Sequence, residues 1–131
     1  MSSILLNIKP RFVIDILNGK KTIEIRKTKP RCELPIRVYI YCGKIIGYFT
    51  LKTIETIKPI DYAIDLTKNE NKGIYWLVKE SCLSFTEFVK YKGKYAWYID
   101  DVVVYDNPRE LKEFNKTHAP QSYCYIDWII K

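Results

Sequence analysis

The segment from Gly19 to Arg26 constrains what this chain can fold into more than any other stretch. Upstream of it, apolar residues recur at helical spacing over residues 12–17. Glycine then stands at position 19, where helices commonly end because glycine enters the left-handed conformation without a Cβ clash. The sequence therefore predicts a helix that ends at Gly19 and a strand that begins only a few residues later.

That strand is expected to carry a polar face and an apolar face. Residues 22–26 alternate polar and apolar side chains, which is the period of a half-buried strand. The two isoleucines are expected to point into the core, and Thr22, Glu24 and Arg26 share the other face. Lys21 stands at the turn, where the alternation does not fix its direction, and it is within reach of the same polar face.

The rest of the pattern predicts one domain of short strands and helices. Gly47, inside an expected strand, indicates a bulge or a close backbone approach. A helix is expected to start at Asn107, because proline follows at its first position. The expected strands cover residues 4–8, 37–42, 45–57, 95–105 and 122–130, with a basic loop over 27–35.

Residues 61–93 are predicted to form a mainly helical excursion between strands, suited to cover a site. Residues 74–80 fit a short helix, and the capping box of Ser84 and Glu87 predicts a second one. Glu80 joins Glu87 as an acid of interest in this segment, although an exposed helix glutamate is usually only solvated. The apolar positions expected to face the core are Phe85, Phe88 and Val89.

Composition excludes several classes of protein. Hydrophobic residues make up 47% and aromatic residues 15% of the chain, which excludes disorder, and no apolar run reaches membrane-spanning length. The first eight residues lack a secretory signal, so a cytoplasmic protein is expected. The four cysteines form no CxxC pair and there is one histidine, so neither a metal site nor a cofactor is predicted.

The positive charge is confined to the first half of the chain. Residues 1–60 hold twelve basic against four acidic side chains, whereas residues 61–131 hold ten against eleven. A positive surface attracts phosphate oxygens through an interaction that depends on salt and not on sequence. The charge therefore predicts a nucleic-acid partner about as strongly as it predicts solubility alone.

The spacing Gly19-x-Lys21-x-x-Glu24-x-Arg26 resembles the GxKxxExR signature of ASCH domains, which are similar to PUA domains. The segments PIRVYIYC at 35–42, YAWYI at 95–99 and APQSYCY at 119–125 resemble the lineage found in phages and prophages. This resemblance implies an α+β fold over residues 1–131: a PUA-like β-barrel of about five to six mostly antiparallel strands, flanking short helices, and a helical insertion at about 61–93.

The resemblance further implies that RNA or a nucleotide binds in the cleft that holds the signature. Lys21 and Arg26 are expected to donate to phosphate, and Glu24 either orients Arg26 or accepts from a base amino group. Tyr39, Tyr41, Trp97 and Tyr123 offer stacking faces, with core packing as the alternative for each. The full set of expected ligand-binding residues is Lys9, Lys21, Thr22, Glu24, Arg26, Tyr39, Gln121 and Ser122.

Two other functions stay open at this point. A related branch hydrolyses acetylated cytidine with the signature lysine, a threonine three residues later and a distant glutamate. Lys21 matches that lysine, but Glu24 occupies the threonine's position, so an amidohydrolase or ribonuclease would rely on Lys21 and Glu24. The third function is a phage-type protein-interaction module, which predicts an exposed apolar patch, with no protein partner indicated.

Overall fold

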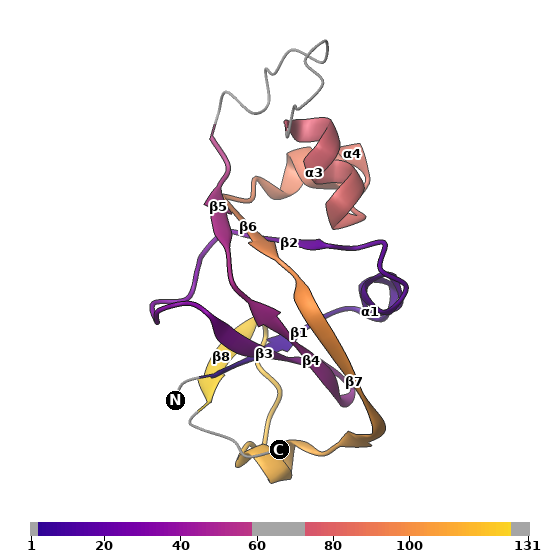
Figure 1. The fold of residues 1–131 in the computed structure, drawn as a ribbon, viewed down its shortest axis with the longest axis vertical. Coiled ribbons are helices and arrows are strands. Elements are labelled where there is room, and N and C mark those ends of the chain that lie inside the picture. The colour runs from indigo at the N-terminus through magenta and orange to yellow at the C-terminus, as the bar shows by residue number, and fades with distance from the viewer. Residues whose placement is uncertain (1–2, 59–72, 127–131) are drawn as a thin grey trace.

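The computed structural model describes residues 3–58 and 73–126, and its strands form two sheets (Figure 1). The larger sheet has the order β7-β4-β3-β1-β8 and the smaller one β2-β6-β5. Strand β1 pairs with β3 in parallel, and every other pairing is antiparallel. The strands are β1 (Ser3–Asn7), β2 (Ile23–Arg26), β3 (Ile36–Cys42), β4 (Lys44–Leu51), β5 (Ile54–Thr56), β6 (Tyr95–Tyr98), β7 (Asp100–Arg109) and β8 (Tyr123–Ile126).

Short helices lie beside the smaller sheet. Helix α1 (Pro10–Leu17) begins at a proline, and Gly19 follows its end with a φ of 76°, as the sequence predicts. Helices α3 (Ile74–Ser81) and α4 (Phe85–Tyr91) come between β5 and β6, and Figure 1 shows them close to β2 and β6. The 3-10 helix η1 (Leu111–Phe114) follows β7. None of the described helices is long and apolar enough to cross a membrane.

The α+β fold and its mostly antiparallel strands confirm the expectation, with differences in detail. Eight strands are described where about five to six were expected, and they form two sheets instead of one closed barrel. Two expected long strands each divide between the sheets. Residues 45–57 give β4 and β5, and residues 95–105 give β6 and the start of β7, because the chain bends at Lys52 and again near Ile99.

The predicted alternation in β2 is confirmed by its packing. Ile23 and Ile25 lie in an apolar cluster that includes Leu77 of α3 and Phe88 of α4. Glu24 and Arg26 project to the other side, where their side chains meet. Strand β2 is thereby held against the helices by one face and offers its charged face to the opposite side.

Three local predictions need correction or confirmation. The predicted helix start at Asn107 is wrong, because β7 continues to Arg109 opposite Ile45 and the helical turn begins only after Glu110. Phe85 and Val89 are 46% and 41% exposed, so Phe88 is the buried one of the three apolar positions in α4. The close approach predicted at Gly47 is confirmed, since a Cβ there would lie 2.1 Å from the Val103 carbonyl oxygen.

Part of the predicted helical insertion lies outside the described residues. Helices α3 and α4 fall within the expected range, and the capping box of Ser84 and Glu87 is present with both of its hydrogen bonds. The expected loop over residues 65–72 and the end of the expected terminal strand, residues 127–130, are not described.

Candidate functional site

A cavity of about 720 Å³ opens beside the charged face of β2. Its walls come from the end of β1, from α1 and α4, from β2 and from the loop before β8. Apolar lining is supplied by Phe12, Leu83 and Tyr91, together with Ile25 of β2. This volume is within the usual range of small-ligand pockets, which combine apolar walls with a few fixed polar groups.

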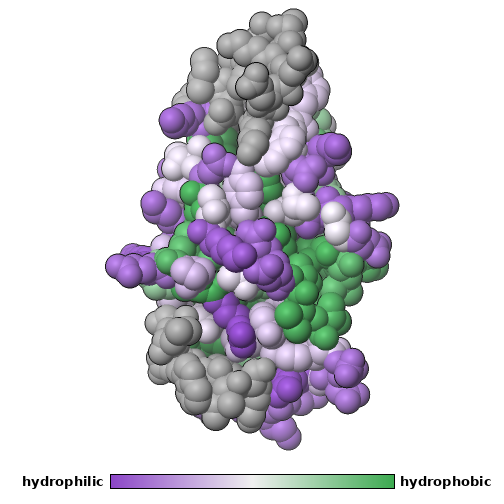
Figure 2. Space-filling model, viewed as in Figure 1, coloured by the Kyte–Doolittle hydropathy of each residue, from purple (hydrophilic) through white to green (hydrophobic). Residues whose placement is uncertain are grey.

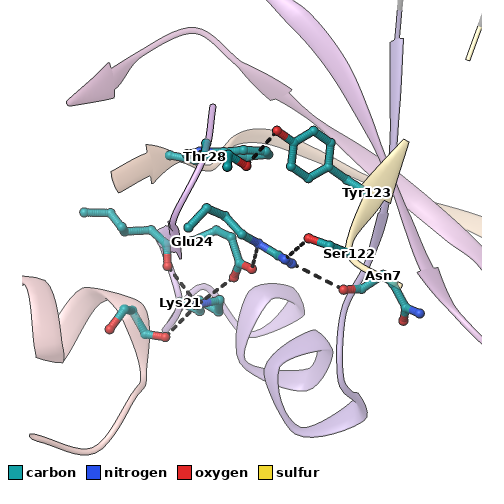
Figure 3. A network of polar contacts seen from close by, with 10 residues as sticks. Asn7, Lys21, Glu24, Thr28, Ser122 and Tyr123 are labelled. Carbon is teal, nitrogen blue, oxygen red and sulfur yellow. Dashed lines mark hydrogen bonds and ion pairs between the residues drawn. The ribbon is translucent and has the colours of Figure 1, made fainter. Parts of the chain in front are cut away.

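Glu24 lies in this cavity between two cations (Figure 3). Its Oε1 is 3.1 Å from Lys21 Nζ, and its Oε2 accepts a hydrogen bond of 2.8 Å from Arg26 Nε. The side chains of Lys21, Glu24 and Arg26 are 2%, 11% and 13% exposed. The three side chains therefore form a nearly buried ionic cluster, in which each carboxylate oxygen has one protein partner.

Lys21 is fully engaged by the protein. Its Nζ donates to the Ile23 carbonyl oxygen at 2.8 Å and to the Ser81 carbonyl oxygen at 2.7 Å, in addition to its contact with Glu24. Three acceptors around the nitrogen match the three N–H groups of an ammonium. Lys21 consequently ties β2 to the end of α3 and fixes Glu24, and it keeps no donor for a ligand.

Arg26 connects the cluster to the loop before β8. Its Nη1 donates to Ser122 Oγ at 2.7 Å, and its Nη2 lies 3.4 Å from the Asn7 carbonyl oxygen. The Asn7 side chain in turn donates to the Pro120 carbonyl oxygen at 2.9 Å. These bonds place Gln121, which lines the cavity, close to the charged face of β2.

The rim of the cavity carries further charges. Lys9, Lys27 and Lys90 line it and are exposed, and Lys27 Nζ lies 4.9 Å from the centre of the Tyr91 ring. Glu87 also lines the cavity, and both of its oxygens accept hydrogen bonds of 2.7 Å from Arg11. The Arg11 guanidinium, followed by the Ser84 backbone N–H, lowers the pKa of the Glu87 carboxyl to about 2.

The structure brings most of the predicted site residues together. Lys9, Lys21, Glu24, Arg26 and Gln121 line the cavity. Ser122 contacts it indirectly through its hydrogen bond from Arg26.

The other two predicted site residues lie elsewhere. Thr22 points away from the cavity lining and donates to Glu80 Oε1, which pairs these two side chains outside the site. Tyr39 has no exposed surface and packs in the core against Phe114, with ring centres 4.8 Å apart, so it is not available for stacking on a base.

The other three predicted stacking residues also serve packing. Trp97 has no exposed surface and donates through Nε1 to the Thr28 carbonyl oxygen at 3.2 Å. Tyr123 packs against Trp97 with ring centres 5.2 Å apart, and its hydroxyl bonds to that of Thr28. Tyr41 is partly buried against the core cluster that contains Tyr39.

Sequence reasoning missed the aromatic and basic residues that α1 and α4 bring to the cavity. Phe12 and Tyr91 were assigned no site role, and Lys90 stands in a segment of unknown docking direction. The capping box predicted that α4 exists, but a capping box says nothing about which face of a helix covers a pocket. Phe12 had one signal, because it is the partly exposed member of the apolar stripe in α1.

Among the described residues, no three His, Cys, Asp or Glu side chains are grouped so that they could hold a metal ion. The four cysteines are free thiols. The chemistry of the cavity therefore rests on one carboxylate, several cations and aromatic or aliphatic walls.

Comparison with known proteins finds similarity at the level of structure. No family model matches the sequence, and no curated protein matches it. The crystal structure of ASCH from Zymomonas mobilis matches with a TM-score of 0.71 and 21% identity, over 95% of this chain and 87% of that chain. Two variants of that protein, with a serine or a tyrosine replaced, match with TM-scores of 0.71 and 0.67. This chain therefore has the fold of the ASCH structures.

Proposed function

We propose that this chain binds single-stranded RNA or a nucleotide in the cavity beside β2. The observation that carries the proposal is a nearly buried carboxylate, Glu24, fixed between two cations in the wall of a cavity with lysines at its rim. The base would lie against Phe12 and Tyr91, since every base has a face that packs on aromatic side chains. The phosphate would lie at the rim.

Glu24 gives the proposed site a preference among bases. Each of its oxygens has one protein partner, and a carboxylate oxygen accepts more than one hydrogen bond. A free acceptor pairs with an exocyclic amino group, which adenine, cytosine and guanine carry and uracil lacks. The proposed site therefore binds the three amino-bearing bases more tightly than uracil.

The lysines at the rim take over the phosphate role that the sequence suggested for Lys21. Lys21 has its three donors on protein acceptors, whereas Lys9, Lys27 and Lys90 are exposed at the cavity. Arg26 retains N–H groups beyond the three that its protein partners use. Phosphate binding through exposed lysines implies that affinity falls as salt is raised.

Calorimetry with the four nucleoside monophosphates and with short RNA oligomers tests the proposal. At low salt we expect binding by the wild type, weaker binding of uridine monophosphate, and loss of that preference in Glu24→Gln. Glu33→Gln is the matched control, because it makes the same change at an exposed glutamate away from the cavity. An absence of heat with every nucleotide and oligomer would end the proposal.

A catalytic role has less support from the site. The three acceptors around Lys21 leave no lone pair on its nitrogen for use as a base. The pair formed by Thr22 and Glu80 lies outside the cavity lining. Analysis of the calorimetry samples for cleaved RNA or deacylated nucleoside tests this alternative directly, and product that depends on Glu24 would revive it.

A further inference from the structure

An exposed apolar surface lies on α1 and β7, outside the cavity. Figure 2 shows an apolar area on this face, to the right of centre, where β7 and α1 lie in Figure 1. Five of the nine large apolar side chains that are exposed belong to these two elements. They are Ile14, Leu17, Val102, Val103 and Val104, with exposed fractions of 58%, 44%, 37%, 40% and 51%.

Strand β7 is also an open sheet edge among the described strands. It is the last strand of the larger sheet, with β4 on one side and no described strand on the other. Val103 stands opposite Tyr48, whose ring packs toward Tyr39, so Val103 faces that side and its neighbours Val102 and Val104 face the other. An edge with three consecutive exposed valines is a template for pairing with another strand.

The sequence of β7 is self-complementary about a point between Val104 and Tyr105. Asp101, with a φ of 50°, and Pro108, without an N–H, interrupt regular pairing at equal distances from that point. The outer ends, Asp100 and Arg109, carry opposite charges and are also equally distant from it. Asp100 belongs to no ion pair among the described residues, and Arg109 reaches Glu113 only at 3.8 Å.

We propose that a second copy of this chain pairs antiparallel with β7 across a two-fold axis. Residues 102–107 of the two copies form the ladder, with Val104 opposite Tyr105, and Asp100 of each copy meets Arg109 of the other. Pairs of β-branched and aromatic residues, and pairs of opposite charges, stabilise antiparallel strands. The exposed Ile14 and Leu17 on neighbouring α1 extend the covered apolar surface. The dimer joins the two larger sheets into one.

Sedimentation velocity across a concentration series tests the dimer. We expect the wild type to move from monomer to dimer, and Val104→Lys to weaken self-association at least about tenfold, because lysine on an edge strand opposes pairing. Val89→Lys, at a similarly exposed valine on α4, is the matched control and should dimerise as the wild type does. Thermal melting of each variant shows that it is folded.

A charge exchange tests the register. Asp100→Arg places like charges opposite each other twice per dimer and should weaken it, as should Arg109→Asp, whereas the double variant should restore it. A wild type that stays monomeric throughout, a Val104→Lys variant that dimerises normally, or a double variant that fails to recover would each overturn the proposal. So would capture of a different protein by this edge in place of a second copy. Nucleotide binding should be unchanged in Val104→Lys, which separates this proposal from that for the cavity.

Discussion

Two contacts between carboxylates and cations line the same cavity, and they differ in how far water reaches them. Glu24 lies between Lys21 and Arg26, with side chains 2% to 13% exposed. Glu87 accepts two hydrogen bonds from Arg11, but these side chains are 43% and 54% exposed. The geometry is good in both, with hydrogen bonds of 2.7 to 2.8 Å.

The difference teaches that burial, more than contact distance, decides what each contact does. Charges attract more strongly where water is excluded, but each buried charge also depends on its partner. The cluster around Glu24 therefore fixes the local structure of β2 and α3. The exposed pair joins α1 to α4 across the rim, and either side chain regains its hydration when the other is removed.

The largest expected effect follows from removing Lys21. Lys21→Met leaves the Glu24 carboxylate with one partner and the Ser81 carbonyl oxygen without its donor. Breaking a buried ion pair in this way costs about 3–5 kcal/mol of unfolding free energy. Urea unfolding measures this loss, and Lys20→Met, at the exposed neighbour, is the control. A loss below about 1 kcal/mol, the size of a surface ion pair, would remove the distinction between the two contacts.

A smaller loss is expected when the carboxylate itself is changed. Glu24→Gln removes the charge but keeps the shape, and Lys21 retains its two carbonyl acceptors. We expect a cost of about 1.5–3 kcal/mol, the value of hydrogen bonds to charged groups. The double variant with Lys21→Met should lose less than the sum of the single losses, because Lys21 and Glu24 interact directly. Strict additivity in urea unfolding would contradict the ionic cluster.

The exposed contact should appear in a titration more clearly than in stability. The folded pKa of Glu87 is lowered to about 2 from a model value of 4.5, so its stabilising contribution is present above pH 4.5 and is lost as the pH falls toward 2. Carboxyl-detected NMR measures this pKa. In Arg11→Ala it should move back toward its ordinary value, because Arg11 is the main cause of the shift. An unchanged pKa in that variant would show that the Ser84 cap alone lowers it.

The smallest expected effect is on unfolding by Arg11→Ala. Both partners of this contact remain hydrated, so we expect no loss of stability beyond the error of urea unfolding at neutral pH. The variant also opens the rim between α1 and α4. A large destabilisation would place this exposed pair beside the buried cluster and would break the comparison.

The sequence predicted the charged face of β2 better than it predicted its surroundings. The alternation over residues 22–26 correctly placed Glu24 and Arg26 together, because side-chain direction in a strand follows from local geometry. The direction of Lys21 was open, since it depends on acceptors from α3, some sixty residues away. Local pattern carries no information about such a partner.

The same reason explains the predictions that failed. The division of residues 45–57 into β4 and β5 depends on which sheet each half joins, and that is decided by packing across the core. Asn107 and Pro108 carry good helix-start chemistry, yet pairing of β7 with β4 continues through them to Arg109. In both places a long-range pairing prevails over a local preference.

The central claim is that Glu24 contacts the base of a bound nucleotide. Amide chemical shifts measured during titration with adenosine, cytidine, guanosine and uridine monophosphates test it most directly. The account predicts shifts at β2, the end of β1 and Gln121, smaller for uridine monophosphate, and equal among the four ligands in Glu24→Gln. Shifts confined to other surfaces, or a wild type that does not distinguish uridine monophosphate from the others, would contradict it.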